Sequence, residues 1–355
     1  MTLRELRGHL AAFRWPSAAR AIAQVTLASG AYVALFGLAI SDGAVALRVV
    51  ASLLAGLISG NLFMIGHDAC HGSFTRLAKL DRVIGRVAFL PSYHPFSLWE
   101  LSHNKAHHIY TNLRGRDFVW TPATKKEYDA KPWARRALYR LYRTPVGLAL
   151  YYPIEIWFPR HVWPRAAVLD RSRPSYTLDR LLVLAFFAVQ LVAVARSSSC
   201  WPVATLFGLI VPWLVFDWLI GFVIYFSHTH PDVRWFGDEA EWTSFEGILA
   251  GTTRLRFPAW SAPVASAIMN HVAHHVDPRI ALVHLEAAQD RIEELVPDRI
   301  IVQTWSIAAL LDIMRRCKLY DFDAACWLDY AGIATTKSSR VRSSSPRSTV
   351  RSLMR

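Results

Sequence analysis

The sequence predicts an all-α, polytopic membrane protein with four transmembrane helices, paired in two hairpins, and a cytosolic helical cap that holds a histidine-rich metal site. Three observations predict this fold class. The chain of 355 residues has 53% hydrophobic and only 19% charged residues, with a mean hydropathy of +0.22. It contains four long apolar segments in closely spaced pairs. Eight of its 14 histidines lie in three tight clusters beyond those segments.

The four apolar segments are long enough, or nearly so, to cross a bilayer. About 20 helical residues span a hydrocarbon core of about 30 Å. The first segment carries no charge, the second only Arg48 near its start, and the fourth only Asp217. The third is the shortest and is bracketed by Arg180 and Arg196. We expect the spans at about 21–40, 43–66, 180–198 and 201–226.

The basic residues predict which side of the membrane each part occupies. The connection within each hairpin is only a few residues long, whereas the segment between the hairpins, roughly 67–178, is rich in lysine and arginine. Cytoplasmic loops carry an excess of these residues. The N-terminus, this central segment and everything after the fourth span are therefore expected in the cytoplasm. We expect a bacterial-type inner membrane, with the three histidine clusters on its cytoplasmic side.

Three regions are expected along the chain. Residues 1–20 form a basic, amphipathic, cytosolic lead-in without a cleavable signal peptide. Residues 21–336 form the membrane domain. Residues 337–355 are mainly serine, arginine and threonine with almost nothing to bury, which predicts a disordered basic tail. The four cysteines show no CxxC or zinc-ribbon spacing, so neither a disulfide framework nor thiolate ligation is expected.

The histidine clusters have the spacing with which a helix directs several imidazoles to one point. Residues four apart differ by only about 40° around the helix axis. The clusters are His67 and His71; His103, His107 and His108; and His271, His274 and His275. Structural zinc takes four ligands and catalytic zinc three, so eight imidazoles predict a centre with two metals. The isolated His9, His94 and His161 are more typical of ordinary core or surface histidines.

Other polar residues close to the clusters are candidates for additional contacts. His228 and His230 directly follow the fourth span, and either could be a further ligand. His284 could orient a ligand or cap a substrate cavity, because metal-bound histidine usually needs an outer hydrogen-bond partner. Further candidates for such contacts are Asp68, Asn104, Asp117, Asn270 and Asp277. The intramembrane acid Asp217 could shape the end of a substrate slot or could be a structural acid facing the bundle.

Four motifs carry a resemblance to a known family. They are HDACHGSF, HNKAHHIYTNLRGRD, FSHTHPD and HVAHHVDPRIALVHL, in this order and with two hydrophobic pairs between them. Together they resemble the integral-membrane fatty acid desaturase and hydroxylase family, whose signature is three histidine boxes. The resemblance covers about residues 20–300, and HTHP with HVAHH is similar to the Δ12/ω-3-like acyl-lipid desaturase branch. The second box has one spacer residue more than the HxxHH that is commoner in this branch.

The resemblance implies a non-haem di-iron enzyme. The eight clustered histidines would bind the two irons, with His228 as the additional ligand and His230 as second choice. O₂ would be the co-substrate, and electrons would come from a separate ferredoxin or cytochrome b5-type donor, because no fused HPGG-bearing cytochrome b5 domain is seen. The acyl chain would be carried on a lipid, on CoA or on acyl-carrier protein, and it would reach the irons from the bilayer. No nucleic acid partner is expected.

Three functions are compatible with these sequence features. The resemblance favours a desaturase that introduces a double bond into an acyl chain. A hydroxylase or other oxygenase on the same scaffold, acting on a lipid or specialised-metabolite chain, is the nearest alternative. A metal transporter belongs to a different class, and would be expected to place polar ligands within the spans, whereas these histidines lie beyond them.

Overall fold

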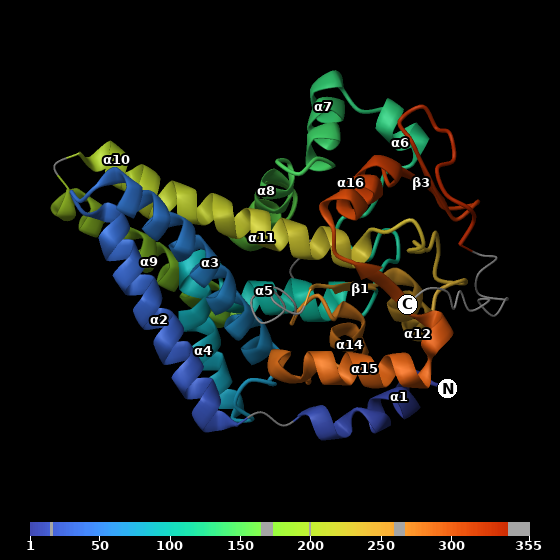
Figure 1. Cartoon of the computed structure of the whole chain (residues 1–355), viewed down its shortest axis with the longest axis horizontal. Coiled ribbons are helices and arrows are strands. Elements are labelled where there is room, and N and C mark those ends of the chain that lie inside the picture. The colour runs from blue at the N-terminus through green and yellow to red at the C-terminus, as the bar shows by residue number, and fades with distance from the viewer. Residues whose placement is uncertain (15–16, 165–172, 199, 259–266, 340–355) are drawn as a thin grey trace, which may run out of the picture.

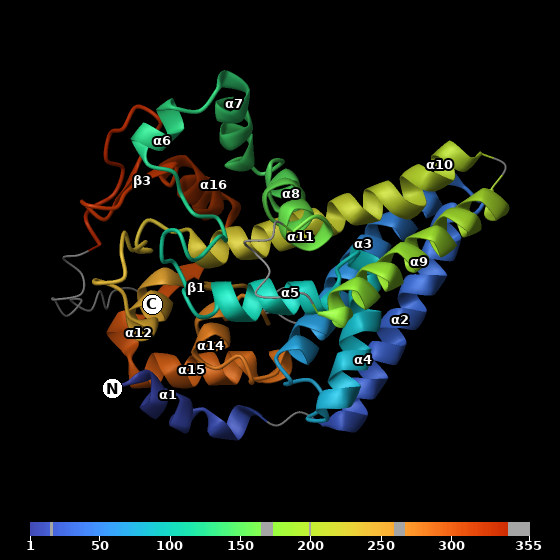
Figure 2. The same ribbon diagram turned by 180° about the vertical axis from the view of Figure 1, so that it is seen from behind.

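The computed structural model describes residues 1–14, 17–164, 173–198, 200–258 and 267–339. Long helices gather on one side of the molecule, and shorter helices with a few strands form a cap at one end of them, as both views show (Figure 1, Figure 2). This architecture confirms the predicted fold class: a mainly helical membrane protein with four candidate spans and a histidine-rich cap.

Four helical stretches are long and apolar enough to cross a membrane, and they come in two pairs. The first pair is α2 (Ala18–Ile40) and α3 (Val45–Cys70). The second pair is α9 (Pro174–Ser197) and a helix formed by α10 (Trp201–Thr205), the π-helical turn η6 (Leu206–Ile210) and α11 (Val211–His228). Their outer faces expose large apolar side chains such as Leu27, Val33 and Leu184, as lipid-facing residues would.

The helix ends differ from the predicted spans in one respect that matters for the site. The second and fourth spans were expected to end at 66 and 226, but α3 continues to Cys70 and α11 to His228. Each helix therefore carries histidine into the cap without a break. The third span also differs from the prediction, because α9 begins at Pro174 and not at about 180.

Close packing between the spans depends on glycine. A Cβ atom on Gly56 of α3 would lie 2.5 Å from Val215 Cβ and 2.8 Å from the carbonyl oxygen of Pro212 in α11. Gly66, one residue before the first histidine, would meet the ring of Phe89 at 2.2 Å. No side chain fits at such distances, so glycine sets the approach of the elements that carry the site.

The cap between the two hairpins consists of short helices. They are α4 (Ala78–Phe89), η2 (Leu90–Ser92), α5 (Phe96–Ser102), η3 (His103–His107), α6 (Lys125–Asp129), α7 (Trp133–Tyr142), α8 (Leu148–Tyr151) and η4 (Tyr152–Val162). Two of these, η3 and η4, are π-helical. π-Helix is rare in proteins, and where it occurs it often lies at a functional site.

The chain after the fourth span completes the cap. Its helices are α12 (Ser244–Gly251), α14 (His271–Val276), η7 (Leu282–His284), α15 (Leu285–Leu295), η8 (Pro297–Arg299) and α16 (Ile307–Arg316). Its strands are β1 (Thr253–Arg256), β2 (Ile301–Thr304), β3 (Leu319–Asp321) and β4 (Cys326–Leu328). β1 pairs with β2 in parallel and β3 with β4 antiparallel. These short strands are the part of the fold that the all-α prediction did not include.

The lead-in packs against the cap. α1 (Leu3–His9) and η1 (Ala11–Arg14) bury Leu6 completely, and the Arg7 guanidinium donates to the Val276 carbonyl oxygen at 2.6 Å. Arg14 forms an ion pair of 2.6 Å with Asp277, whose side chain is fully buried. Both partners lie at the end of α14, so the N-terminal segment braces the helix of the third histidine cluster.

The predicted regions 1–20, 21–336 and 337–355 stay predictions. Of the predicted tail, residues 337–339 are described, and Ser339 donates its backbone N–H to the Ala325 carbonyl oxygen at 2.8 Å. The rest of the tail lies outside the described residues.

Candidate metal centre

The first and third histidine clusters lie on ordinary helical turns. His67 is in the last turn of α3 and His71 caps it, one turn later. His271, His274 and His275 lie on α14, all buried. Because positions separated by three or four residues share a helix face, each helix presents its imidazoles to the same interior space. The fourth contributor is His228, the last residue of α11, which is fully buried.

The second cluster lies on a π-helical turn. Residues His103–His107 form η3, and the His108 N–H donates to the His103 carbonyl oxygen at 3.0 Å, a bond between residues five apart. A π turn accommodates one residue more than an α turn. The extra spacer residue of HNKAHH is absorbed there, and His103 and His108 meet with their Nε2 atoms 2.9 Å apart.

The nine histidines form two compact groups. Within each group, one nitrogen from every residue lies within 4.8 Å of the others. The first group is His67, His71, His103, His108 and His274; the second is His107, His228, His271 and His275. All three clusters contribute to the first group, and the second adds His228. The adjacent residues His107 and His108 are divided between the groups, as are His274 and His275.

The nitrogens within each group face one another at short range. His67 Nε2 lies 3.1 Å from His274 Nε2 in the first group. In the second, His271 Nε2 lies 3.0 Å from His228 Nε2 and 3.1 Å from His275 Nε2. Nitrogen donors of this number and kind suit a transition metal such as iron, copper, nickel or zinc. The convergence of uncharged nitrogens therefore fits one metal ion per group.

Buried polar atoms without partners support this fit. His71 Nε2 and His108 Nδ1 are buried and make no hydrogen bond within the described part of the chain. A buried nitrogen without a partner is unfavourable. A metal ion bound in the first group would provide the missing interaction for His71 Nε2, whereas His108 presents its other nitrogen, Nε2, to the group.

The protonation states also suit metal binding. Burial, with a contribution from neighbouring histidines, lowers the pKa of His103, His108, His274 and His275 well below its usual value. The pKa of His271 falls to about 3 for the same main reason. These imidazoles are therefore neutral near pH 7, and neutral imidazole is the form that ligates metals.

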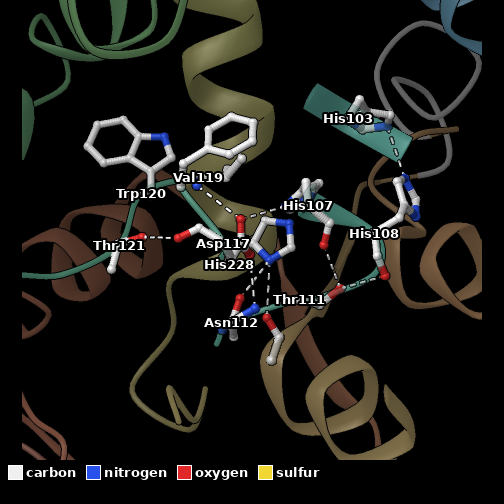
Figure 3. A network of polar contacts seen from close by, with 12 residues as sticks. His103, His107, His108, Thr111, Asn112, Asp117, Val119, Trp120, Thr121 and His228 are labelled. Carbon is white, nitrogen blue, oxygen red and sulfur yellow. Dashed lines mark hydrogen bonds and ion pairs between the residues drawn. The ribbon is translucent and has the colours of Figure 1, made fainter. Parts of the chain in front are cut away.

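Every histidine of the second group has an outer hydrogen-bond partner, and Figure 3 shows those of His107 and His228. His107 Nδ1 donates to Asp117 Oδ1 at 3.0 Å, and His228 Nδ1 to Asn112 Oδ1 at 3.1 Å. His275 Nδ1 lies 3.0 Å from Thr111 Oγ1, whose own hydrogen goes to the His107 carbonyl oxygen. His271 Nδ1 donates to the Ile268 carbonyl oxygen at 3.2 Å. Each ring is thus oriented with Nε2 free for a metal.

Asp117 holds several parts of this network together. Its carboxylate accepts from His107 and from the backbone N–H groups of Asn112 and Val119, at 2.9 and 3.0 Å. Burial alone would raise the pKa of this carboxyl, but His107 and the backbone donors outweigh it and lower the pKa. Asp117 is therefore ionised, and this predicted outer partner contacts a histidine of the second group.

The other predicted contacts are distributed more widely. Asp68 lies 3.5 Å from His67 Nδ1 but accepts a shorter bond, 2.8 Å, from the Leu282 N–H. Asn104 donates to the carbonyl oxygen of Cys70 at 3.3 Å, beside the first group. Asp277 binds Arg14 and Arg279 instead of a histidine. Asn270 precedes α14 and donates to the Ala267 carbonyl oxygen at 3.3 Å.

Two predicted histidines belong to neither group. His230 lies 3.3 Å from Gln303 Oε1 and accepts from the Asp232 N–H. His284 lines a separate small cavity with Arg20, Gln24 and Asp68. Between the two candidates that follow the fourth span, the geometry therefore favours His228.

An apolar cavity of about 50 Å³ adjoins both groups. Its wall includes His67 and His103 from the first group and His107 and His271 from the second. Most of the remaining wall is apolar: Phe63, Met64, Phe118, Val119, Ile156, Ile220, Val223, Ile224 and Ile268. Asp217 is not among the lining residues; it is buried in α11 with its Oδ2 atom unpaired among the described residues.

Several residues at the site carried no signal of their own in the sequence. Thr111 and Asn112 follow the second cluster within one helical turn, and that proximity was the only available clue. The Trp99 ring stacks on His103 with 4.1 Å between ring centroids. Tyr152 and His161 line the cavity from η4, a segment far from every cluster in sequence. Only the tertiary fold brings η4 to the site.

Comparison with known proteins identifies relatives with this pattern. The family model described as fatty acid desaturase matches residues 43–306. The chain is 28% identical over 263 residues to the chloroplastic omega-6 fatty acid desaturase of Brassica napus, covering 73% of this chain and 57% of that protein. It is 29% identical over 260 residues to the sn-1 oleoyl-lipid 12-desaturase of Synechocystis sp., covering 73% of this chain and 72% of that protein.

The matched region contains the whole candidate metal centre. The chloroplastic omega-6 fatty acid desaturase of Arabidopsis thaliana is 28% identical over 270 residues, which are 73% of this chain and 56% of that protein. The aligned part thus spans a little over half the length of the two plant proteins. Residues 43–306 make up well over half of the present chain and include all nine histidines of the two groups. The chain therefore belongs to the fatty acid desaturase family.

Proposed function

We propose that this protein is a membrane-bound, O₂-dependent fatty acyl desaturase that introduces a double bond into an acyl chain, with two irons held by the two histidine groups. The observation that carries the proposal is the apolar cavity whose wall contains histidines of both groups. A hydrocarbon chain in this cavity would lie against the centre. The names of the relatives, which act on fatty acids and on oleoyl lipid, support an acyl substrate.

The protein residues position the chain and exclude water. Bulky side chains such as Phe63, Ile220 and Ile224 make the cavity narrow and hydrophobic, so it accepts a hydrocarbon segment in few orientations. Irons bound by the two groups would supply the O₂-derived oxidant that removes hydrogen from an unactivated C–H bond. Loss of hydrogen from two neighbouring carbons gives the double bond.

The membrane arrangement that we propose follows the positive-inside rule. Arg20 and Arg173 lie at the cap end of the spans, whereas the short connection between α2 and α3 carries Asp42 as its only charged residue. The cap, and with it the metal centre, would lie on the cytoplasmic side of a bacterial-type inner membrane. On that side a separate electron donor, a ferredoxin or a cytochrome b5-type protein, would dock on the surface of the cap.

The decisive test is expression in a host with a known fatty acid profile together with a ferredoxin system. We expect a new double bond in lipid acyl chains, and its position gives the regiochemistry. The His107→Ala variant should abolish it, whereas His9→Ala, at an exposed histidine outside both groups, should not. A product that has gained one oxygen instead of losing two hydrogens would identify a hydroxylase. If no lipid changes, a carrier-bound or non-fatty substrate replaces the lipid.

The transporter alternative predicts a different metal behaviour. A transporter must release its cargo, whereas the two groups here are buried at the cap end of the spans with outer partners that fix the rings. Iron that stays with the purified protein during prolonged dialysis supports the enzyme. Zinc that exchanges readily and leaves no iron behind would contradict it.

A further inference from the structure

Three polar side chains interrupt the apolar wall of the cavity, and none of them belongs to a metal group. Ser102 comes from α5, and Tyr152 and His161 come from η4. His94 lies behind them, with its ring centroid 5.4 Å from that of His161. A hydrocarbon chain needs no polar partners. Whether one of these polar side chains has a further role therefore depends on whether its hydrogen bonds are already made within the protein.

Tyr152 and His94 satisfy each other. His94 Nδ1 lies 2.7 Å from the Ser92 carbonyl oxygen and donates to it. His94 Nε2 is then the acceptor, and the Tyr152 hydroxyl donates to it at 2.8 Å. Both ring nitrogens of His94 are therefore occupied, and this pair needs no ligand.

His161 differs because only one of its ring nitrogens is occupied. Its Nε2 atom lies 2.9 Å from Ser102 Oγ. The Ser102 hydroxyl donates its single hydrogen to the helix carbonyl oxygens of Leu98 and Trp99, at 3.2 and 3.1 Å. With this hydrogen assigned to the carbonyl oxygens, Ser102 accepts from His161, which donates from Nε2. Nδ1 is left without a hydrogen, as a bare acceptor.

This acceptor has no partner among the residues that the structure describes, although His161 is only 1% exposed. Burial also lowers the pKa of His161 well below its usual value, which agrees with a neutral ring. A buried acceptor without a donor is unfavourable. His161 is one of the residues that line the cavity, so a molecule bound there is the candidate for the missing donor.

We propose that His161 Nδ1 accepts a hydrogen bond from a hydroxyl group held in the cavity, either a hydroxyl on the substrate chain or a fixed water molecule. The hydroxyl would lie close to the first metal group, because Ser102 directly precedes its ligand His103. His161 is thus a positioning residue that sets which part of a chain lies beside the centre. This inference rests on the proposed function, since it takes the cavity to be the acyl slot.

Matched variants separate the two nitrogens of His161. Asparagine places its amide oxygen near the position of Nδ1, so His161→Asn keeps the acceptor and loses the contact with Ser102. Glutamine reaches the position of Nε2, so His161→Gln keeps the contact with Ser102 and loses the acceptor. His161→Phe removes both and keeps an aromatic ring. Ser102→Ala tests whether the serine matters through His161 alone.

The assay measures binding to the iron-loaded, detergent-solubilised protein without oxygen, so that no turnover occurs. The probes are methyl stearate and a series of methyl hydroxystearates with the hydroxyl at different positions, followed by quenching of tryptophan fluorescence. If the donor is a substrate hydroxyl, one positional isomer should bind the wild-type protein about tenfold more tightly than methyl stearate. His161→Asn should keep this preference, and His161→Gln and His161→Phe should lose it with unchanged iron content.

If the donor is water, no isomer is preferred, and a high-resolution structure with bound methyl stearate should contain a water molecule within hydrogen-bond distance of Nδ1. Absence of both the preference and the water would overturn the proposal, as would a preference that persists in His161→Phe. Failure of the proposed function looks different: methyl stearate itself would not bind the wild-type protein.

Discussion

His228 and His230 are two residues apart in one motif, yet the fold gives them opposite surroundings. His228 completes the second group and donates to Asn112, whereas His230 contacts Gln303 on β2. We predict that His228→Ala loses iron and lowers desaturation at least about 100-fold, because it removes a direct ligand. His230→Ala should stay within about twofold of wild type. Iron content and product yield, measured side by side, test this, and equal effects of the two changes would refute the assignment.

Asp117 acts on the second group through His107. Replacing it with asparagine keeps the size of the side chain but removes the charge that orients the His107 ring and stabilises its Nδ1–H. We predict that Asp117→Asn weakens metal binding by about 10- to 100-fold, measured as iron retained against a competing chelator. The control is Asp129→Asn, an exposed carboxylate paired with Lys125. Equal iron retention in both variants would show that Asp117 has no such role.

Among the secondary-structure elements, the π turn of the second histidine box gives the most specific prediction. It accommodates one extra residue between His103 and His107. Deleting the exposed Lys105 should convert it to an ordinary α turn and keep the histidines directed at the same groups. We predict that this deletion retains iron and at least a third of the activity. A threefold loss of rate corresponds to a rise of about 0.6 kcal/mol in the activation free energy.

The matched control is deletion of Ala69 in the first box, where the helix is regular. Removing one residue there changes the angle between His67 and His71 around the helix axis from about +40° to about −60°. His71 then lies on the other side of His67, away from the first group, so iron binding should be lost. The two deletions are compared by iron content in the purified protein. Loss of iron in the Lys105 deletion as well would mean that the longer spacing itself is required.

The elements show what could be predicted from the sequence and what could not. Helical spacing was sufficient to predict that His67 with His71, or His271 with His274 and His275, share a face, because that relation is local. The division of adjacent residues such as His107 and His108 between two groups depends on how α3, η3, α11 and α14 pack, which is not encoded in any one segment. His161 received no role for the same reason, since η4 reaches the cavity only in the folded chain.

In the proposed topology, the cap and the hairpin tips of the molecule lie on opposite sides of the membrane. Cys200 lies at the tip between α9 and α10 and is exposed, whereas Cys70, Cys317 and Cys326 are buried. We predict that a membrane-impermeant thiol reagent labels intact spheroplasts at Cys200, and that Cys200→Ser abolishes the labelling. Labelling that occurs only after the membrane is opened would place the cap outside and contradict the proposed topology.

The central claim is that the nine histidines hold two irons, and the iron content of the purified protein tests it most directly. The protein is reconstituted without oxygen, freed of loosely bound metal, and measured by elemental analysis together with Mössbauer spectroscopy. We predict two irons per chain, in two nitrogen-rich sites, and a loss of iron from the His228→Ala variant. A single iron per chain, or zinc in its place, would contradict it.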